Sequence, residues 1–208
     1  MWISSSARVL PGCTIGPGSC VADFSIVGHP AAATLRDLTA KLSRGESAVS
    51  LTELVASSGF DARTRIGQGA QVRSFCVIYE DVTIGDRLDL AHFVTIREGC
   101  TLGADCYLKV GADLRRGVRV GDRATIAGLL GDRSIVGNGS TVLGDLVHRS
   151  SGAHRGEIEL APVIEDDVFV GRHSTVIGGV RVGSGAYIAS GVTVRRDVPA
   201  GAMIKLDW

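Results

Sequence analysis

The sequence predicts an all-β fold, a parallel β-helix in which three six-residue repeats make one coil. Aliphatic side chains recur every six residues, and an aliphatic–glycine pair recurs every eighteen. The composition agrees, because 28 glycines and only 5% aromatic residues suit an aliphatic core with many tight turns. The longest unbroken six-residue series is Ile66, Val72, Ile78, Ile84, Leu90, Ile96, Leu102, Leu108, Leu114, Val120 and Ile126.

Neither an α-helix nor an alternating strand places one residue inward every six positions. Three short flat faces per coil, each with one inward side chain, give that spacing and close a triangular prism. Successive coils then stack in parallel at the spacing of neighbouring strands. The repeats cover residues 7–28, 63–147 and 163–198, so we expect a single β-helix domain over residues 1–208.

Two segments interrupt the repeats. Residues 30–60 have helical spacing, and Ser50 with Glu53 forms a capping box, which predicts two short inserted helices. Residues 143–162 form the larger break, which predicts a protruding loop that bears His148 and His154. An insertion in a solenoid becomes a loop on one face, and binding is common there.

The bulk properties exclude several classes of protein. The 22 basic and 22 acidic residues balance, so we expect no nucleic-acid partner. The start of the sequence has no secretory pattern, and no apolar run has the length of a membrane span. The five cysteines are an odd number without zinc-ligand spacing. We therefore expect a cytoplasmic protein with reduced thiols, no metal and no membrane insertion.

With this repeat, the sequence resembles the bacterial hexapeptide-repeat acyltransferases. The resemblance implies a left-handed β-helix, a homotrimer with sites between subunits, and acyl transfer from a coenzyme A (CoA) thioester. Acetyl-CoA is the default donor. Direct transfer needs a general base, for which histidine suits, and a donor for the developing oxyanion. The sequence has no Gly-x-Ser-x-Gly elbow for a covalent route.

His148 is the first candidate base. It follows Val142 by six residues, where the register calls for Ile or Val. Residues 144–171 are similar to the catalytic loop of galactoside- and maltose-type O-acetyltransferases, in which a loop histidine is the base and a proline, here Pro162, closes the loop. The Thr-x-x-His-Pro context of those enzymes is absent, and a structural or substrate-contacting role is the alternative.

His92 is the second candidate, two residues after the inward Leu90 and so on an outward corner. Its position looks like that of the catalytic histidine in sialic-acid and bacillosamine type sugar N-acetyltransferases. A solvated corner histidine is the alternative. His29, His154 and His173 are interpreted as surface or supporting residues.

The tail YIASGVTVRRDVPAGAMI resembles the terminal coil of the family. The match implies that Ser190 meets the pantetheine arm of CoA, that Arg195 and Arg196 lie near its phosphates, and that Arg172 contacts CoA from the preceding coil. Guanidinium groups pair well with phosphate oxygens. Solvated arginines are the alternative, and the residues that usually follow Asp-Val-Pro in the family are missing.

Residues 161–191 are also similar to tetrahydrodipicolinate N-acyltransferases, so the expected acceptors are a sugar or nucleotide-linked amino sugar, a natural product of aminoglycoside type, or an amino acid. O- and N-transfer both stay open. A non-catalytic trimeric scaffold is one rival. Another is a γ-type carbonic anhydrase, which binds zinc through three histidines, two of them five apart; here His148 and His154 are six apart. A sugar nucleotidyltransferase needs a nucleotide-binding domain for which residues 1–60 are too short.

Overall fold

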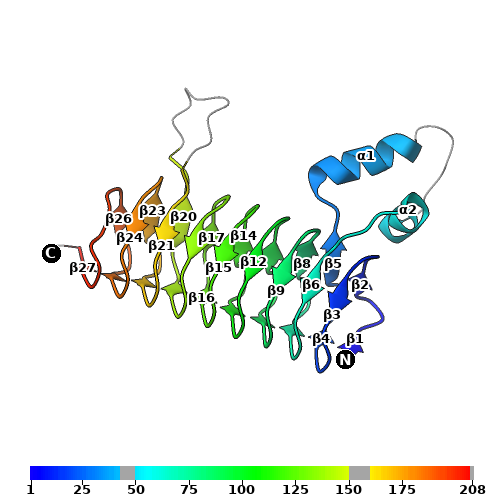
Figure 1. Ribbon diagram of the computed structural model, residues 1–208, viewed down its shortest axis with the longest axis horizontal. Coiled ribbons are helices and arrows are strands. Elements are labelled where there is room, and N and C mark those ends of the chain that lie inside the picture. The colour runs from blue at the N-terminus through cyan, green and yellow to red at the C-terminus, as the bar shows by residue number, and fades with distance from the viewer. Residues whose placement is uncertain (43–49, 150–159, 207–208) are drawn as a thin grey trace.

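The computed structural model confirms the predicted fold, a left-handed triangular β-helix with two short helices beside its N-terminal coils (Figure 1). It describes residues 1–42, 50–149 and 160–206. Three parallel sheets, named A, B and C, form the flat sides of the prism. In each coil the chain passes from sheet A to sheet B to sheet C.

The described strands are mostly two residues long and are grouped by sheet. Sheet A has ten strands: β1 (Trp2–Ile3), β4 (Cys20–Val21), β7 (Gln71–Val72), β10 (Asp89–Leu90), β13 (Tyr107–Leu108), β16 (Thr125–Ile126), β19 (Thr141–Val142), β22 (Phe169–Val170), β25 (Tyr187–Ile188) and β27 (Met203–Ile204). Sheet B has nine: β2 (Arg8–Val9), β5 (Ile26–His29), β8 (Val77–Tyr79), β11 (Thr95–Ile96), β14 (Asp113–Leu114), β17 (Leu129–Leu130), β20 (Asp145–Val147), β23 (Thr175–Ile177) and β26 (Thr193–Val194). Sheet C has eight: β3 (Thr14–Ile15), β6 (Arg65–Ile66), β9 (Thr83–Ile84), β12 (Thr101–Leu102), β15 (Arg119–Val120), β18 (Ile135–Val136), β21 (Val163–Ile164) and β24 (Arg181–Val182).

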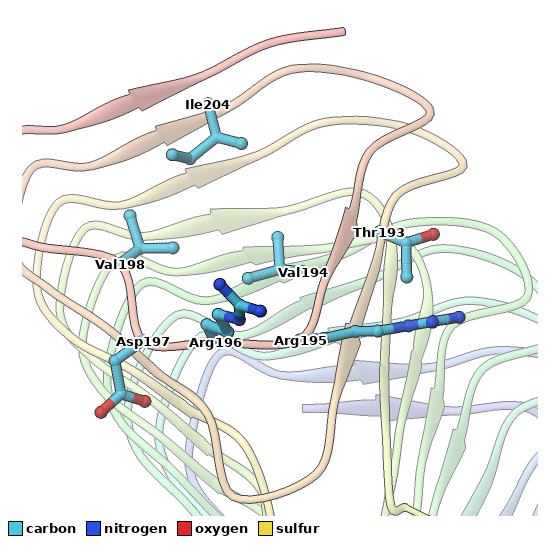
Figure 2. A pocket seen from close by; sticks show the side chains of 7 residues that line it. All are labelled: Thr193, Val194, Arg195, Arg196, Asp197, Val198 and Ile204. Carbon is cyan, nitrogen blue, oxygen red and sulfur yellow. The ribbon is translucent and has the colours of Figure 1, made fainter.

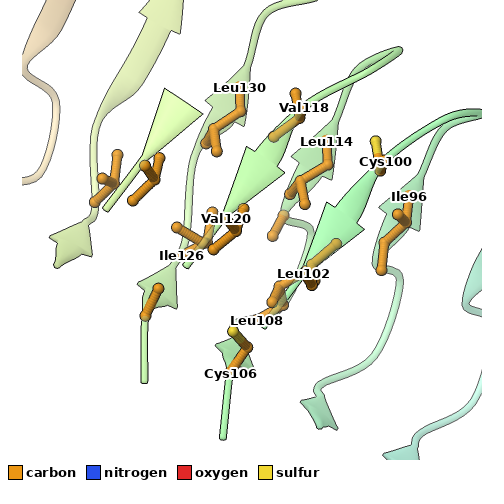
Figure 3. Close-up of a cluster of buried hydrophobic side chains, with 14 of the residues drawn as sticks. Ile96, Cys100, Leu102, Cys106, Leu108, Leu114, Val118, Val120, Ile126 and Leu130 are labelled. Atoms are coloured by element: carbon orange, nitrogen blue, oxygen red, sulfur yellow. The ribbon is translucent and has the colours of Figure 1, made fainter. Parts of the chain in front are cut away.

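The six-residue register is the register of the core. Leu90 pairs with Leu108 and Ile96 with Leu114, each one coil of eighteen residues further on. All eleven inward positions from Ile66 to Ile126 are buried, with at most 5% of their surface exposed. Figure 3 shows part of these stacked columns. Full burial of one such side chain contributes about 1.5–3 kcal/mol, so the columns dominate the stability.

The prism extends beyond the predicted repeats at both ends. β1 pairs with β4, and β27 pairs with β25, although neither outer strand lies in a segment that the repeat pattern covered. Their outward residues Trp2 and Met203 are more than half exposed. The terminal coils are therefore held by backbone pairing more than by the aliphatic register.

The predicted insertion at 30–60 contains helices α1 (Ala32–Leu42) and α2 (Leu51–Ser58). Ser50 is the N-cap of α2, and one half of the predicted capping box is confirmed, because the Glu53 amide donates to Ser50 Oγ at 3.3 Å. The helices leave the prism after β5, between sheets B and C, near the N-terminal end (Figure 1). They bury a small cluster of their own against the first coil: Leu10, Leu38, Leu54 and Val55.

Glu80, on the coil beside the insertion, anchors α1. Its side chain is 92% buried, since the residue exposes only 8% of its surface. Its Oε1 accepts the Ala31 amide at 3.1 Å and the Thr34 hydroxyl at 2.5 Å. A carboxylate at a helix N-terminus satisfies amides that have no partner within the helix.

The predicted loop at 143–162 starts later than the pattern suggested. Residues 145–147 form β20, which pairs with β17 and β23, so the coil continues to Val147. The expectation that His148 replaces a core residue was wrong, because Leu146 takes the inward position and is fully buried. His154 lies outside the described residues.

Candidate functional site

The A–B edge, where the chain turns from sheet A to sheet B, carries three of the predicted site residues. His92, Arg172 and Ser190 each lie two residues after the inward residue of a sheet A strand, and all three are exposed. Backbone hydrogen bonds join successive corners: the Gly111 amide donates to His92 O at 3.1 Å, and the Gly191 amide to Arg172 O at 2.9 Å. These residues therefore line one straight edge of the prism.

Two consecutive coils shorten this edge. Inward residues on sheets A and B are normally six apart, but only four residues separate Ile126 from Leu130 and Val142 from Leu146. Glycine is required at both turns: a Cβ on Gly128 would lie 1.9 Å from Gly144 O, and a Cβ on Gly144 would lie 2.3 Å from Ser174 O. We call these two turns the set-back corners.

The set-back corners lie between two full corners, one at Val110 toward the N-terminal end of the prism and one at Arg172 toward the C-terminal end. The set-back corners are shorter than the full corners on either side of them, and Gly144 is buried. Arg172, on the full corner after them, has no ion-pair partner among the described residues. The A–B edge thus carries a cation and a histidine on either side of the set-back corners.

The B–C edge, where the chain turns from sheet B to sheet C, carries the other predicted residues, His148, Arg195 and Arg196. His148 is half-buried and follows β20 directly. Its ring covers Gly131 on the preceding coil, since a Cβ there would lie 3.1 Å from His148 Cδ2.

The structure does not bring the two candidate bases together. His92 precedes β11 on one edge of sheet B, and His148 follows β20 on the other. Three coil steps separate their strands, or about 14 Å along the prism. Within one chain, the two imidazoles therefore cannot belong to the same site.

The four predicted CoA-contacting residues lie on the last two full coils, Ser190 and Arg172 on the A–B edge and Arg195 and Arg196 on the B–C edge. Ser190, Arg195 and Arg196 share the last coil, joined by β26, and Arg172 occupies the neighbouring corner of the coil before. At this end of the prism there is a cavity of about 320 Å³ (Figure 2). Its lining residues are Thr193, Val194, Arg195, Arg196, Asp197, Val198 and Ile204.

The cavity combines an apolar floor with a cationic rim. Val194 and Val198 are core residues, 5% and 6% exposed, while Arg195 and Arg196 are exposed. In Figure 2 the Arg196 side chain is directed to the side where Val194 lies, and the Arg195 side chain extends away from it. An apolar surface beside two guanidinium groups suits a flat heterocycle that carries phosphates.

The thiols are poorly suited to nucleophilic attack. Burial raises the pKa of Cys100 to about 12 and that of Cys13 to about 11, and it also raises the pKa of Cys76 and Cys106. A thiol must lose its proton to act as a nucleophile, and these four are held neutral. An acyl intermediate on any of these four cysteines is therefore disfavoured.

Sequence reasoning missed an aromatic ladder on the A–B edge, beside His92. Phe24, Phe75 and Phe93 stack with ring centroids 5.2 Å apart at both steps. The signal was present, because Phe75 and Phe93 are eighteen residues apart at the same corner position. The shortened spacing after Val142 was also readable, since the same four-residue step follows Ile126.

The described residues form neither a metal-binding cluster nor a membrane-spanning helix. No group of three or more His, Cys, Asp or Glu side chains is arranged to hold a metal ion. No helix in the described part of the chain is long and apolar enough to cross a membrane.

Family models match two stretches of the prism. Residues 161–196 match the bacterial transferase hexapeptide (six repeats), and residues 93–128 match the hexapeptide repeat of succinyl-transferase. These two stretches of the chain carry hexapeptide repeats. Both matches lie in segments where the aliphatic columns run unbroken through sheets A, B and C, apart from the set-back corner at Gly128.

Solved structures agree with this hexapeptide-repeat assignment at the level of fold. The UDP-N-acetylglucosamine acyltransferase of Francisella novicida is 16% identical, with a TM-score of 0.57 over 97% of this chain and 65% of that chain. LpxA from Acinetobacter baumannii is 16% identical, with a TM-score of 0.50 over 97% of this chain and 69% of that one. This hexapeptide-repeat chain thus spans about two thirds of the length of these structures.

Proposed function

We propose that the protein is an acyltransferase that moves an acyl group, most simply acetyl, from a CoA thioester to a hydroxyl or amine of a small molecule. The observation that carries the proposal is the cavity on the last coil, where Arg195 and Arg196 border an apolar floor. This combination fits the adenosine and phosphates of CoA, and Ser190 and Arg172 lie across sheet B from the two arginines, on the A–B edge. The matched transferase hexapeptide models support the reaction class.

The A–B edge gives the pantetheine arm a path. From Ser190 the edge passes Arg172 and the set-back corners before it reaches Val110 and His92. Five coil steps, about 24 Å, separate the coils of Ser190 and His92. An extended arm along this edge would bring the thioester toward His92, so we favour His92 over His148 as the base.

In the proposed reaction the acceptor oxygen or nitrogen attacks the thioester carbonyl carbon, and His92 accepts the acceptor's proton. The carbon–sulfur bond breaks, and CoA leaves as its thiol after protonation. The reaction also needs a hydrogen-bond donor for the carbonyl oxygen as it gains charge. His148 is the alternative base, since it lies only two coil steps, about 10 Å, from the coil of Arg195.

The proposed acceptor is a sugar or nucleotide-linked amino sugar, and the proposed assembly is a homotrimer with each site between two subunits. A flat-sided prism can bury one face against a neighbour, which leaves a cleft between the prisms. Because CoA is a cytoplasmic metabolite, we place the protein in the cytoplasm.

The test is an acceptor screen with acetyl-CoA, read by mass spectrometry of the acylated product. The panel contains amino sugars, nucleotide-linked amino sugars and amino acids. His92→Ala is expected to lower kcat by about 10²–10⁴-fold with little change in KM for acetyl-CoA. His148→Ala, the matched variant, is expected to retain most activity. The reverse result would move the base to the B–C edge.

A further inference from the structure

The aromatic ladder on the A–B edge ends with an open ring face. Phe24, Phe75 and Phe93 occupy the same corner position in three successive coils, with nearly parallel rings. The two end rings expose 60% and 59% of the residue surface, and the middle ring exposes 47%. This difference arises because Phe75 has a neighbour on both faces, whereas Phe24 and Phe93 have a neighbour on one.

The next position of the ladder is Gly111, which has no side chain. Its amide donates to His92 O at 3.1 Å, as the amides of Phe75 and Phe93 donate to the corners below them. A Cβ built on Gly111 meets no atom within 4 Å. The space above Phe93 is therefore open, and the set-back corners begin one coil further on.

The open position lies beside the candidate base and a lysine. The His92 ring centroid is 6.3 Å from that of Phe93. Lys109 precedes Gly111 by two residues, and it makes no ion pair with a described residue, although its Nζ lies over the Tyr107 ring, 6.0 Å from the centroid. Asp113, in the strand that follows the corner, is paired with Arg115 at 2.9 Å.

We infer that the Gly111 position binds a flat aromatic ring, stacked on Phe93 as a fourth member of the ladder, with an anionic group directed to Lys109. The ligand class is a nucleoside phosphate. If the proposed function holds, its source is the nucleotide of the acceptor, because the adenosine of CoA is assigned to the cavity beside Arg195 and Arg196. Stacking of a base on an aromatic side chain is sequence-tolerant and is worth about 1–3 kcal/mol.

Gly111→Phe tests the inference by filling the open position while leaving Phe93 in place. Phenylalanine is compatible with this turn, because Gly111 has φ +73° and the three ladder phenylalanines have φ 57–63°. Gly185→Phe is the matched control. Gly185 also has positive φ (+68°) and open surroundings, but it lies between sheets C and A.

Uridine diphosphate, adenosine diphosphate and free CoA would each be titrated calorimetrically into the full chain and its variants. We expect Gly111→Phe to lower the affinity for at least one of these ligands by at least about fivefold relative to Gly185→Phe. Lower affinity for a nucleoside diphosphate with unchanged CoA affinity would assign the site to the acceptor. Lower affinity for CoA would place the adenosine of CoA on the ladder and would contradict its placement beside Arg195 and Arg196. Phe93→Ala is expected to lower the affinity for the same ligand, and Phe75→Ala is expected to lower it less.

Three results would overturn the inference: no binding of any of the three ligands to the wild-type chain, equal affinities for the two glycine variants, or a change of association state in Gly111→Phe by light scattering. The last would show that a second copy of the chain covers the ladder. These failures differ from failure of the proposed function. If CoA binding and acyl transfer persist in Gly111→Phe, the proposed transferase function is unaffected. If the wild-type chain binds a nucleotide but not CoA, the inferred ring site is supported and the proposed transferase function fails.

Discussion

Ser134 and Ser140 occupy equivalent positions in one coil, two residues before the inward Val136 and Val142, and both are fully buried. Their hydroxyl groups differ. Ser140 Oγ donates to Glu165 O at 2.6 Å and accepts the Val168 amide at 3.0 Å. Ser134 Oγ has no hydrogen-bond partner among the described residues. Comparison of the two serines therefore separates the free-energy cost of burying a hydroxyl group from the stabilisation that its hydrogen bonds provide.

Replacement by alanine should change the stability in opposite directions. Ser134→Ala removes a desolvated hydroxyl and breaks no bond, so we expect the free energy of unfolding to rise by about 1 kcal/mol. Ser140→Ala leaves the Val168 amide buried without a partner, so we expect a loss of about 1–3 kcal/mol. The two variants should therefore differ by about 2–4 kcal/mol.

Thermal and urea unfolding monitored by circular dichroism measure this difference. For a chain of this size, 1 kcal/mol corresponds to a change in Tm of about 2–4 °C. The urea m-value should stay constant, which would show that the surface exposed on unfolding is unchanged. A Ser134→Ala variant that loses as much stability as Ser140→Ala would refute the reasoning, because it would mean that the Ser134 hydroxyl has a partner.

Three further predictions concern other parts of the prism. Gly128→Ala and Gly144→Ala should each lower Tm strongly, since the new Cβ would meet a backbone oxygen at 1.9 or 2.3 Å; unchanged Tm values would contradict the set-back corners. The raised pKa of Cys100, about 12, means that its neutral form is favoured in the folded state, so stability should be constant below about pH 9 and fall between there and pH 12. Urea titrations at pH 8 and 10 should show a loss on the order of 1 kcal/mol for this thiol, and a slope unchanged by Cys100→Ala would count against the assignment. Glu80→Ala should lower the helical signal and cost about 1–3 kcal/mol, because the Ala31 amide loses its acceptor, whereas Glu80→Gln should retain most of the stability; equal losses would show that the charge, not the acceptor, matters.

The fold was readable from the sequence because one side chain every six residues has one geometric solution. Ile66, Leu90 and Leu114 needed no tertiary information to be placed inside. The capping box at Ser50 was equally local. The position of His148 in the repeat could not be predicted in this way, because counting six residues from Val142 assumes a full corner. The glycine that permits the shorter turn, Gly144, had been read as part of a loop.

The candidate site was less predictable, since it depends on which corner each residue occupies. Counting from the inward residue placed His92 outward correctly, but did not show that it shares an edge with Arg172 and Ser190. That result requires the lengths of all intervening corners. The ladder that ends at Phe93 was missed for a similar reason: aromatic residues were scarce, and their stacking becomes visible only when the coils are superposed.

Calorimetric titration of the full chain with acetyl-CoA and with CoA tests the central claim most directly. The account predicts binding in the micromolar range, weakened by at least about tenfold when Arg195 and Arg196 are both replaced by alanine, because two phosphate contacts are lost. Arg119→Ala with Arg123→Ala, on the sheet C side and away from the cavity, is the matched control and should bind normally. Absence of binding at millimolar CoA, or equal affinity in the two double variants, would contradict the account.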